Sequence, residues 1–219
     1  MNHGDIAERR AVVDRVWHGD GELWMNIEPV QPCLDRNDTS RLDGMLESLQ
    51  KLCIDAGARA CAVIDCGDLQ FVEGGAGLQD ASIEEKSIFW PVPRFPKDSI
   101  VDALRLYRKA VVFGLNVDAG GSRADAMKTI YDIAGRVESA CFYGGYYLAI
   151  GLAAGNCKEV FCAKEAKCQA LTVGKPCRYP LRSRPSIEAC GLDLEAIAAK
   201  AGWDDVGPDA FLTGMVFVA

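Results

Sequence analysis

Four cysteines that lie close together in the sequence constrain the fold of this chain more than any other feature. They are Cys157, Cys162, Cys168 and Cys177, and their spacing is C-x4-C-x5-C-x8-C. The segment around them lacks the periodicity of a helix or a strand, so it is expected to be an irregular loop that can curl around a small object. The four thiols could form a metal site, pair as disulfides, or pack as small hydrophobic side chains.

The composition argues against disulfides. The chain has 219 residues, of which 49% are hydrophobic, and this is enough to build a core without covalent cross-links. The N-terminal segment has no apolar stretch of signal-peptide length, and the longest apolar run, from Tyr146 to Ala154, is about half as long as a membrane span. We therefore expect a cytoplasmic protein without a membrane segment, whose ten cysteines stay reduced, so that metal binding or redox chemistry explains the high cysteine content better than disulfides do.

Charge and histidine content exclude further classes. The net charge of -7 argues against a duplex nucleic-acid partner, which would select a basic surface. The two histidines, His3 and His18, both lie in the polar N-terminal segment. A Ser/His/Asp triad, a Cys/His dyad or a histidine-rich zinc site would need one of them to fold back into a pocket, and we do not expect this.

The hydrophobic pattern predicts an α+β fold, a small mixed or antiparallel sheet with packed helices and a cysteine-rich metal-binding loop region. Three segments are expected: an N-terminal extension (1–37), an α/β core (38–154) and a cysteine-rich cluster-binding segment (155–219) that completes the same domain. The expected helices cover 41–57, 96–110, 122–155, 187–191 and 194–203, and the expected strands cover 58–65, 69–73, 110–117 and 211–219. The first two strands are expected to form a hairpin, and residues 74–98, with the sequence WPVPRFP, a connecting loop.

The cysteine spacing favours an iron-sulfur cluster over zinc. Four thiolates from one segment suit either a tetrahedral zinc ion or a [4Fe-4S] cluster. Zinc sites are usually built from C-x2-4-C pairs, whereas every gap here is four residues or more and no histidine lies nearby. A cluster is larger and accepts wider gaps, so we take Cys157, Cys162, Cys168 and Cys177 as ligands of a [4Fe-4S] cluster, with zinc as the alternative.

The cysteine segment is also basic. Residues 157–184 carry seven basic and two acidic residues, a net charge of +5, which leaves -12 for the rest of the chain. The basic residues are Lys158, Lys164, Lys167, Lys175, Arg178, Arg182 and Arg184. A cluster held by four thiolates is an anion, and nearby cations lower the cost of burying it. A solvated basic face is the simpler alternative.

The other six cysteines are Cys33, Cys53, Cys61, Cys66, Cys141 and Cys190, and we expect none of them to bind metal. Cys61 and Cys66 are an odd number of residues apart on or beside a predicted strand, so their side chains should point to opposite faces. Cys53, Cys141 and Cys190 lie on predicted helices among apolar neighbours, where cysteine packs as a small hydrophobic residue.

The sequence around the thiols resembles a known family. Gly155-Asn156-Cys157 follows an aromatic segment, Cys177-Arg178-Tyr179-Pro180 comes later, and Arg184-Pro185-Ser186-Ile187-Glu188-Ala189-Cys190-Gly191-Leu192-Asp193 closes the region. This pattern is similar to that of the "predicted metal-binding protein" family of unknown function, specifically over 140–195 and more weakly over 57–116. The resemblance implies that Cys157, Cys162, Cys168 and Cys177 are metal ligands.

Two positions depart from the family pattern. Tyr179 stands where the family usually has histidine, so a role of that ring is lost or changed. The family usually has further cysteines before and within a Cys-Pro-Pro motif, where this chain has Trp90-Pro91-Val92-Pro93. If those family cysteines hold a second site, that site is absent here.

Three functions fit these features. The first is a [4Fe-4S] protein in electron transfer, a redox accessory subunit or partner of a larger enzyme of anaerobic metabolism, with a redox partner protein and a possible homo-oligomer. The second is an enzyme that uses the cluster, or a pocket lined by WPVPRFP and by Phe142, Tyr143, Tyr146 and Tyr147, on a small substrate. The third is a binding module stabilised by structural zinc or by a cluster.

Overall fold

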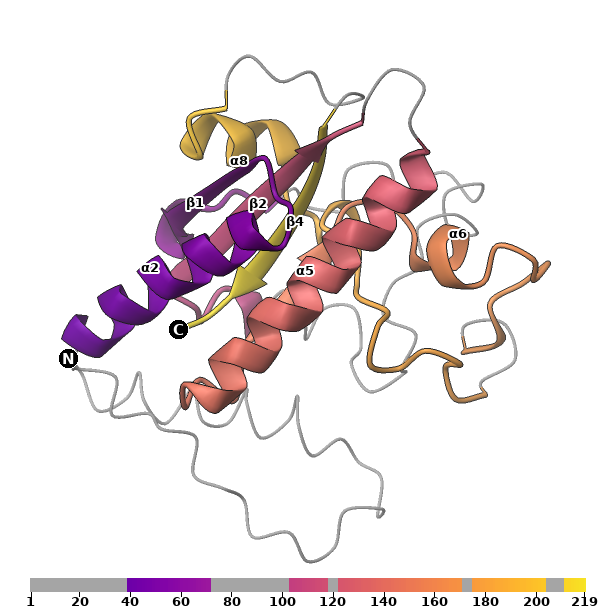
Figure 1. The fold of residues 1–219 in the computed structure, drawn as a ribbon, viewed down its shortest axis with the longest axis horizontal. Helices are drawn as coiled ribbons and strands as arrows, with labels where there is room; N and C mark the ends of the chain where they lie inside the picture. Colours follow the sequence, from indigo (N-terminus) through magenta and orange to yellow (C-terminus); the bar gives the residue numbers. More distant parts are fainter. Residues whose placement is uncertain (1–38, 72–102, 118–121, 171–174, 204–210) are drawn as a thin grey trace, which may run out of the picture.

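The computed structural model describes residues 39–71, 103–117, 122–170, 175–203 and 211–219, which form helical layers on both faces of one antiparallel sheet (Figure 1). The strands are β1 (Ala60–Asp65), β2 (Lys109–Asn116), β3 (Ile150–Ala153) and β4 (Phe211–Phe217). The α-helices are α2 (Thr39–Asp55), α5 (Arg123–Tyr143), α6 (Cys157–Phe161) and α8 (Leu194–Lys200), and the short 3-10 helices are η2 (Cys66–Asp68) and η3 (Glu188–Cys190). The α+β prediction is confirmed.

The last strand in the sequence lies inside the sheet. The strand order is β1-β2-β4-β3, and each neighbouring pair is antiparallel. Met215 of β4 lies opposite Val112 of β2 on one side and Leu152 of β3 on the other. Every residue of β4 is buried, as expected for a strand that is covered on both faces. The strand predicted at 211–219 is confirmed, and it joins β3 to the rest of the sheet.

Successive residues of the strands face two different hydrophobic cores. Val111 and Phe113 of β2 pack with the buried side chains of α2 and α5, whereas Ala110 and Val112 face the layer that contains η3 and α8. Helix α2 contributes Leu42, Leu46, Leu49 and Cys53 to the first core, and α5 contributes Met127, Ile130, Ile133, Ala134, Val137 and Cys141. These residues recur at helical spacing, so the amphipathic pattern itself fixes which side of each helix meets the sheet.

The long helix expected over 122–155 ends at Tyr143, so that prediction is wrong. Helix α5 begins after Ser122, whose Oγ accepts a hydrogen bond from the Asp125 N–H at 3.3 Å, and Gly144 follows its last residue. Ile150–Ala153 then forms β3 and pairs with β4. A short apolar run that is buried on all sides has the same pattern in a strand and in a helix, so periodicity alone could not separate the two.

The hairpin expected from 58–65 and 69–73 is also wrong. Strand β1 pairs with β2, a segment much later in the sequence. Phe71 forms an isolated bridge with Leu192, and residues 72–73 lie outside the described residues. Of the helix predicted over 96–110, the structure describes only residues 103–110. The predicted end of this helix is wrong, because Lys109 already belongs to β2.

Other predictions fall outside the described ranges. These include the N-terminal extension, both histidines, Cys33 and the sequence WPVPRFP. The division of the chain into segments at residues 37 and 154 stays a prediction. Among the helices that the structure describes, none combines the length and the apolar character needed to cross a bilayer.

Gly214 offers a test of the packing between the sheet and α5. A Cβ atom at this position would lie 2.3 Å from Phe113 Cε2 and 3.0 Å from Ile130 Cγ2, and both neighbours are fully buried. We expect Gly214→Ala to lower the free energy of unfolding by about 2 kcal/mol, since the neighbours have little room to move. Urea denaturation measures this change.

Gly44 of α2 is the matched control, because a Cβ atom there has no neighbour within 4 Å. Gly44→Ala should raise the free energy of unfolding by about 0.5 to 1 kcal/mol, since alanine favours a helix. Equal effects of the two substitutions would contradict the described packing.

Candidate metal centre

The first of the four cysteines is placed by the N-terminus of α6. Asn156 caps this helix, and its Oδ1 accepts a hydrogen bond from the Lys158 N–H at 2.7 Å. Cys157 is the first residue of the helix and is only 6% exposed. Phe161 packs edge-on against Tyr131 of α5, with ring centroids 5.4 Å apart. The start of the cysteine segment is therefore held against α5, beside which α6 lies in Figure 1.

The structure brings the four cysteines into one neighbourhood. Burial, together with the smaller effect of the nearby thiols of Cys168, Cys177 and Cys162, raises the pKa of the Cys157 thiol to about 12. Burial also raises the pKa of Cys162, and Cys177 and Cys168 add to this shift. Ionisable groups influence one another in this way when they are close in space. These interactions indicate that the four thiols lie in the same region of the structure, and no group of three or more His, Cys, Asp or Glu side chains among the described residues is arranged to hold a metal ion.

Cys177 has a polar environment. Its Sγ accepts a hydrogen bond from the Tyr179 N–H at 3.3 Å and lies 3.6 Å from Ser183 Oγ. The Ser183 hydroxyl donates to the Tyr179 carbonyl at 2.9 Å, so these three residues form one local network. An N–H group that points at a cysteine sulfur stabilises its thiolate form and tunes a metal group bound to it.

A buried ion pair holds the segment after Cys177 in place. The Arg184 guanidinium donates to Glu138 of α5 and, through Nη1, to the carbonyls of Leu181 and Ser183 at 3.0 and 2.9 Å. Glu138 Oε1 also accepts from the Gly151 N–H of β3 at 2.7 Å. The two side chains are only 10% and 22% exposed. The pair therefore ties helix α5, strand β3 and the cysteine segment together.

The residues that follow Arg184 cap local structure. Ser186 Oγ accepts from the Ala189 N–H at 2.9 Å, and Asp193 Oδ1 accepts from the first turn of α8. Glu188 Oε1 accepts from the Gly155 N–H at 3.3 Å, next to the first cysteine. Capping side chains of this kind satisfy N–H groups that a helix leaves free. The sequence pattern assigned no role to these residues or to Glu138. For Ser186 and Asp193, the position just before a helical turn was the available signal of a cap.

Three buried polar atoms near Cys157 have no hydrogen-bond partner within the described part of the chain. They are Tyr131 Oη, Arg184 Nε and Glu188 Oε2. Burial raises the pKa of Tyr131 well above its usual range, and the nearby Cys157 and Glu188 raise it further. Buried polar atoms normally have a hydrogen-bond partner, so these three atoms mark a polar region of the interior around Tyr131.

A comparison with family models identifies the chain. The model described as "Predicted metal-binding protein (DUF2284)" matches residues 93–217, which include all four cysteines and the capping residues above. The chain belongs to this metal-binding family. No curated protein and no solved structure matches it. The match supports metal binding, which is the predicted property of the family, and it identifies neither the metal nor the ligands.

The donor set of this metal-binding protein fits a thiophilic metal group. Four cysteines, one buried and three half-buried, lie within a lobe of net charge +5, and a backbone N–H points at one sulfur. Thiolates in such surroundings suit a [4Fe-4S] cluster or zinc and disfavour hard cations such as magnesium. The assignment of Cys157, Cys162, Cys168 and Cys177 as ligands stays a prediction.

The other described cysteines lie in the two cores. Cys61 packs with the first core and Cys66 belongs to the second, which confirms that they point to opposite faces of the sheet. A hydrogen bond to Cys61, with burial, holds the pKa of Cys53 well above its usual range. Burial raises the pKa of Cys66, Cys141 and Cys190 to about 12. The thiols of Cys53, Cys66, Cys141 and Cys190 therefore stay neutral near pH 7, as expected for small hydrophobic side chains.

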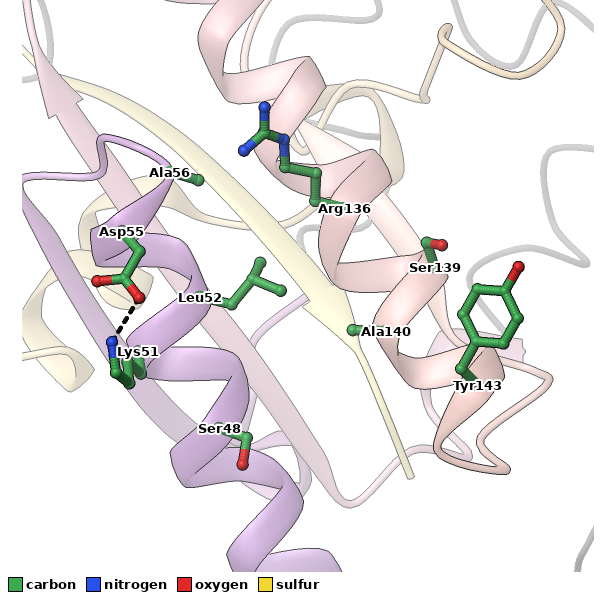
Figure 2. Close-up of a pocket in the computed structure, with 9 residues that line it drawn as sticks. All are labelled: Ser48, Lys51, Leu52, Asp55, Ala56, Arg136, Ser139, Ala140 and Tyr143. Atoms are coloured by element: carbon green, nitrogen blue, oxygen red, sulfur yellow. Dashed lines mark hydrogen bonds and ion pairs between the residues drawn. The ribbon is translucent and has the colours of Figure 1, made fainter.

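The aromatic residues proposed to line a pocket lie apart from the thiols. Phe142, Tyr143 and Tyr147 are 55%, 86% and 41% exposed, and their rings contact one another. Tyr143 borders a groove of about 520 Å³ between α2 and α5 (Figure 2). At 1.5 Å per residue this end of α5 is about 18 Å from Tyr131, which lies beside the thiol site. The groove contains the Lys51–Asp55 ion pair at 2.5 Å and no cysteine.

Removal of the Glu138 charge tests the ion pair. Glu138→Gln keeps the shape of the side chain but leaves the Arg184 charge buried and unpaired, so we expect a loss of about 3 kcal/mol in the free energy of unfolding. The control is Asp132→Asn, because Asp132 pairs with Arg182 at 2.9 Å on the surface. The control should cost about 1 kcal/mol or less. A ranking in the opposite order by urea denaturation would refute the role of Glu138.

Alkylation rates test the difference between the two classes of cysteine. In metal-free protein at pH 8, the half-buried Cys168 and Cys177 should react with iodoacetamide at least about tenfold faster than Cys66, Cys141 and Cys190, whose thiols are buried and protonated. Mass spectrometry of peptides measures each rate, and unfolding in guanidinium should make the rates similar. Fast modification of Cys190 in the folded protein would contradict the structure.

Proposed function

We propose that the protein binds a [4Fe-4S] cluster through Cys157, Cys162, Cys168 and Cys177 and transfers single electrons as an accessory subunit or partner of a larger anaerobic enzyme. One observation carries this proposal: four cysteines of one short basic segment lie near enough for their thiols to influence one another. Family membership supports metal binding, and the cluster is the group that the donor set and spacing favour.

The residues of the site have different tasks in this proposal. Cys157 is the inner ligand, fixed by the Asn156 cap and buried against α5. Cys162, Cys168 and Cys177 are half-buried and form the outer side. A bound cluster would supply reversible one-electron chemistry. The protein supplies the thiolates, the Tyr179 N–H to Cys177 and the cations that offset the negative charge of the ligands.

Tyr179 explains how the site accommodates a departure from the family pattern. Its backbone, and not its ring, makes the contact with Cys177, and the ring lies against Phe161 with centroids 5.7 Å apart. The hydrogen bond to sulfur is therefore independent of the side chain at this position.

Metal content of cysteine variants tests the ligand assignment. We expect protein purified without oxygen to be brown, to contain iron and sulfide, and to lose colour on reduction by dithionite. Cys177→Ser should lose most of its iron, whereas Cys61→Ser, a control at another half-buried cysteine, should keep it. Cys157→Ala and the equally buried Cys190→Ala form a second matched pair.

The outcomes separate the alternatives. Zinc in place of iron, lost in the same variants, would leave the ligands intact but replace electron transfer by a structural role. Iron retained in Cys157→Ala and Cys177→Ser would overturn the ligand assignment. Circular dichroism of each variant shows whether the fold has survived.

A further inference from the structure

We propose that three exposed lysines on the thiol lobe, Lys164, Lys167 and Lys175, dock a small acidic electron-carrier protein. These residues are called the lysine face. This inference rests on the proposed function, since it names the partner that would exchange electrons with the site. It goes further by assigning the surface and the charge of that partner.

Four lysines of residues 157–184 remain after the three arginines form their ion pairs, and the lysine face consists of the three that are exposed, since Lys158 is half-buried. Arg184 pairs with Glu138, Arg182 with Asp132, and Arg178 with Glu165. Arg182 also stacks on the Phe161 ring at 4.8 Å. The three lysines are exposed and make no ion pair among the described residues. Their charge is therefore directed to solvent, where an acidic partner can meet it.

Two further side chains of the same segment add exposed apolar surface. Leu181 is 85% exposed and Tyr179 is 38% exposed, and Tyr179 contacts the sulfur of Cys177 through its N–H. Specific interfaces commonly have an apolar centre with a charged rim. Leu181 and Tyr179 supply such a centre beside a candidate ligand, and the lysines supply the rim.

The burial of the four cysteines favours approach of the partner protein from the side of the half-buried ones. Cys157 is buried against α5, whereas Cys162, Cys168 and Cys177 are half-buried. The lobe from 157 to 184 has a net charge of +5 and the rest of the chain -12. An acidic protein would thus be repelled elsewhere and attracted to the surface nearest the thiols. Charge complementarity of this kind accelerates association and fixes orientation.

Charge reversal tests the lysine face. The variant Lys164→Glu/Lys167→Glu/Lys175→Glu is compared with Arg41→Glu/Lys51→Glu/Arg59→Glu, which changes the net charge equally at exposed positions of α2 and the turn after it. The probe is an acidic [2Fe-2S] ferredoxin. Its binding is measured by calorimetry, and the rate at which its reduced form reduces the full chain is measured by stopped-flow absorbance.

We expect the lysine variant to lose at least about tenfold in binding and in reduction rate at low salt, and the control variant to stay within about twofold of wild type. The wild-type rate should fall as salt is added, because the attraction is screened. Iron content and a redox titration of each variant separate a lost docking surface from a changed potential.

Three results would overturn the proposal: equal losses in the two variants, a wild-type rate that does not depend on salt, or binding of duplex DNA in preference to ferredoxin. Failure of the proposed function gives a different result, because a chain without redox-active iron would show no electron transfer. In that case the calorimetric binding of ferredoxin, which does not require iron, still decides the docking surface.

Discussion

The buried ion pair between Glu138 and Arg184 is the interaction on which the thiol site depends. It joins helix α5 to the segment that follows Cys177, and Glu138 also accepts a hydrogen bond from β3. Formation of the pair costs desolvation energy, so the pair adds little to the free energy of unfolding. Its main effect is to fix the position of the segment after Cys177 on α5. Without it, the chain after Cys177 would have no buried polar anchor on α5 among the contacts described here.

This anchor fixes one end of the cysteine segment, and the Asn156 cap fixes the other. The segment begins at the Asn156 cap of α6 and ends at Arg184, and both ends lie on the α5 and β3 framework. Gly155 is held by Glu188, which comes after Arg184 in the sequence. A loop with two fixed ends has fewer conformations, so less entropy is lost when a metal group gathers its cysteines.

Sequence patterning predicted the fold where local pattern and tertiary contact agree. Helix α2 has its apolar residues at helical spacing, β4 is apolar throughout, and Cys61 and Cys66 point to opposite faces as strand geometry requires. The prediction failed for β3, because a short buried strand and a buried helix have the same apolar pattern. It also failed for the partner of β1, because β2 lies far along the chain. Glu138 and Arg184 are 46 residues apart, and no local pattern links them. The ligand assignment made from the cysteine spacing stays a prediction, and the identity of the metal depends on chemistry that neither the sequence pattern nor the packing determines.

X-ray absorption at the iron and zinc edges, on full-length protein purified without oxygen, tests the central claim most directly. The account predicts an iron signal with a sulfur shell and a second shell from neighbouring iron atoms, as in a [4Fe-4S] cluster. A zinc signal with a single sulfur shell at about 2.3 Å, and no iron, would contradict electron transfer by this site.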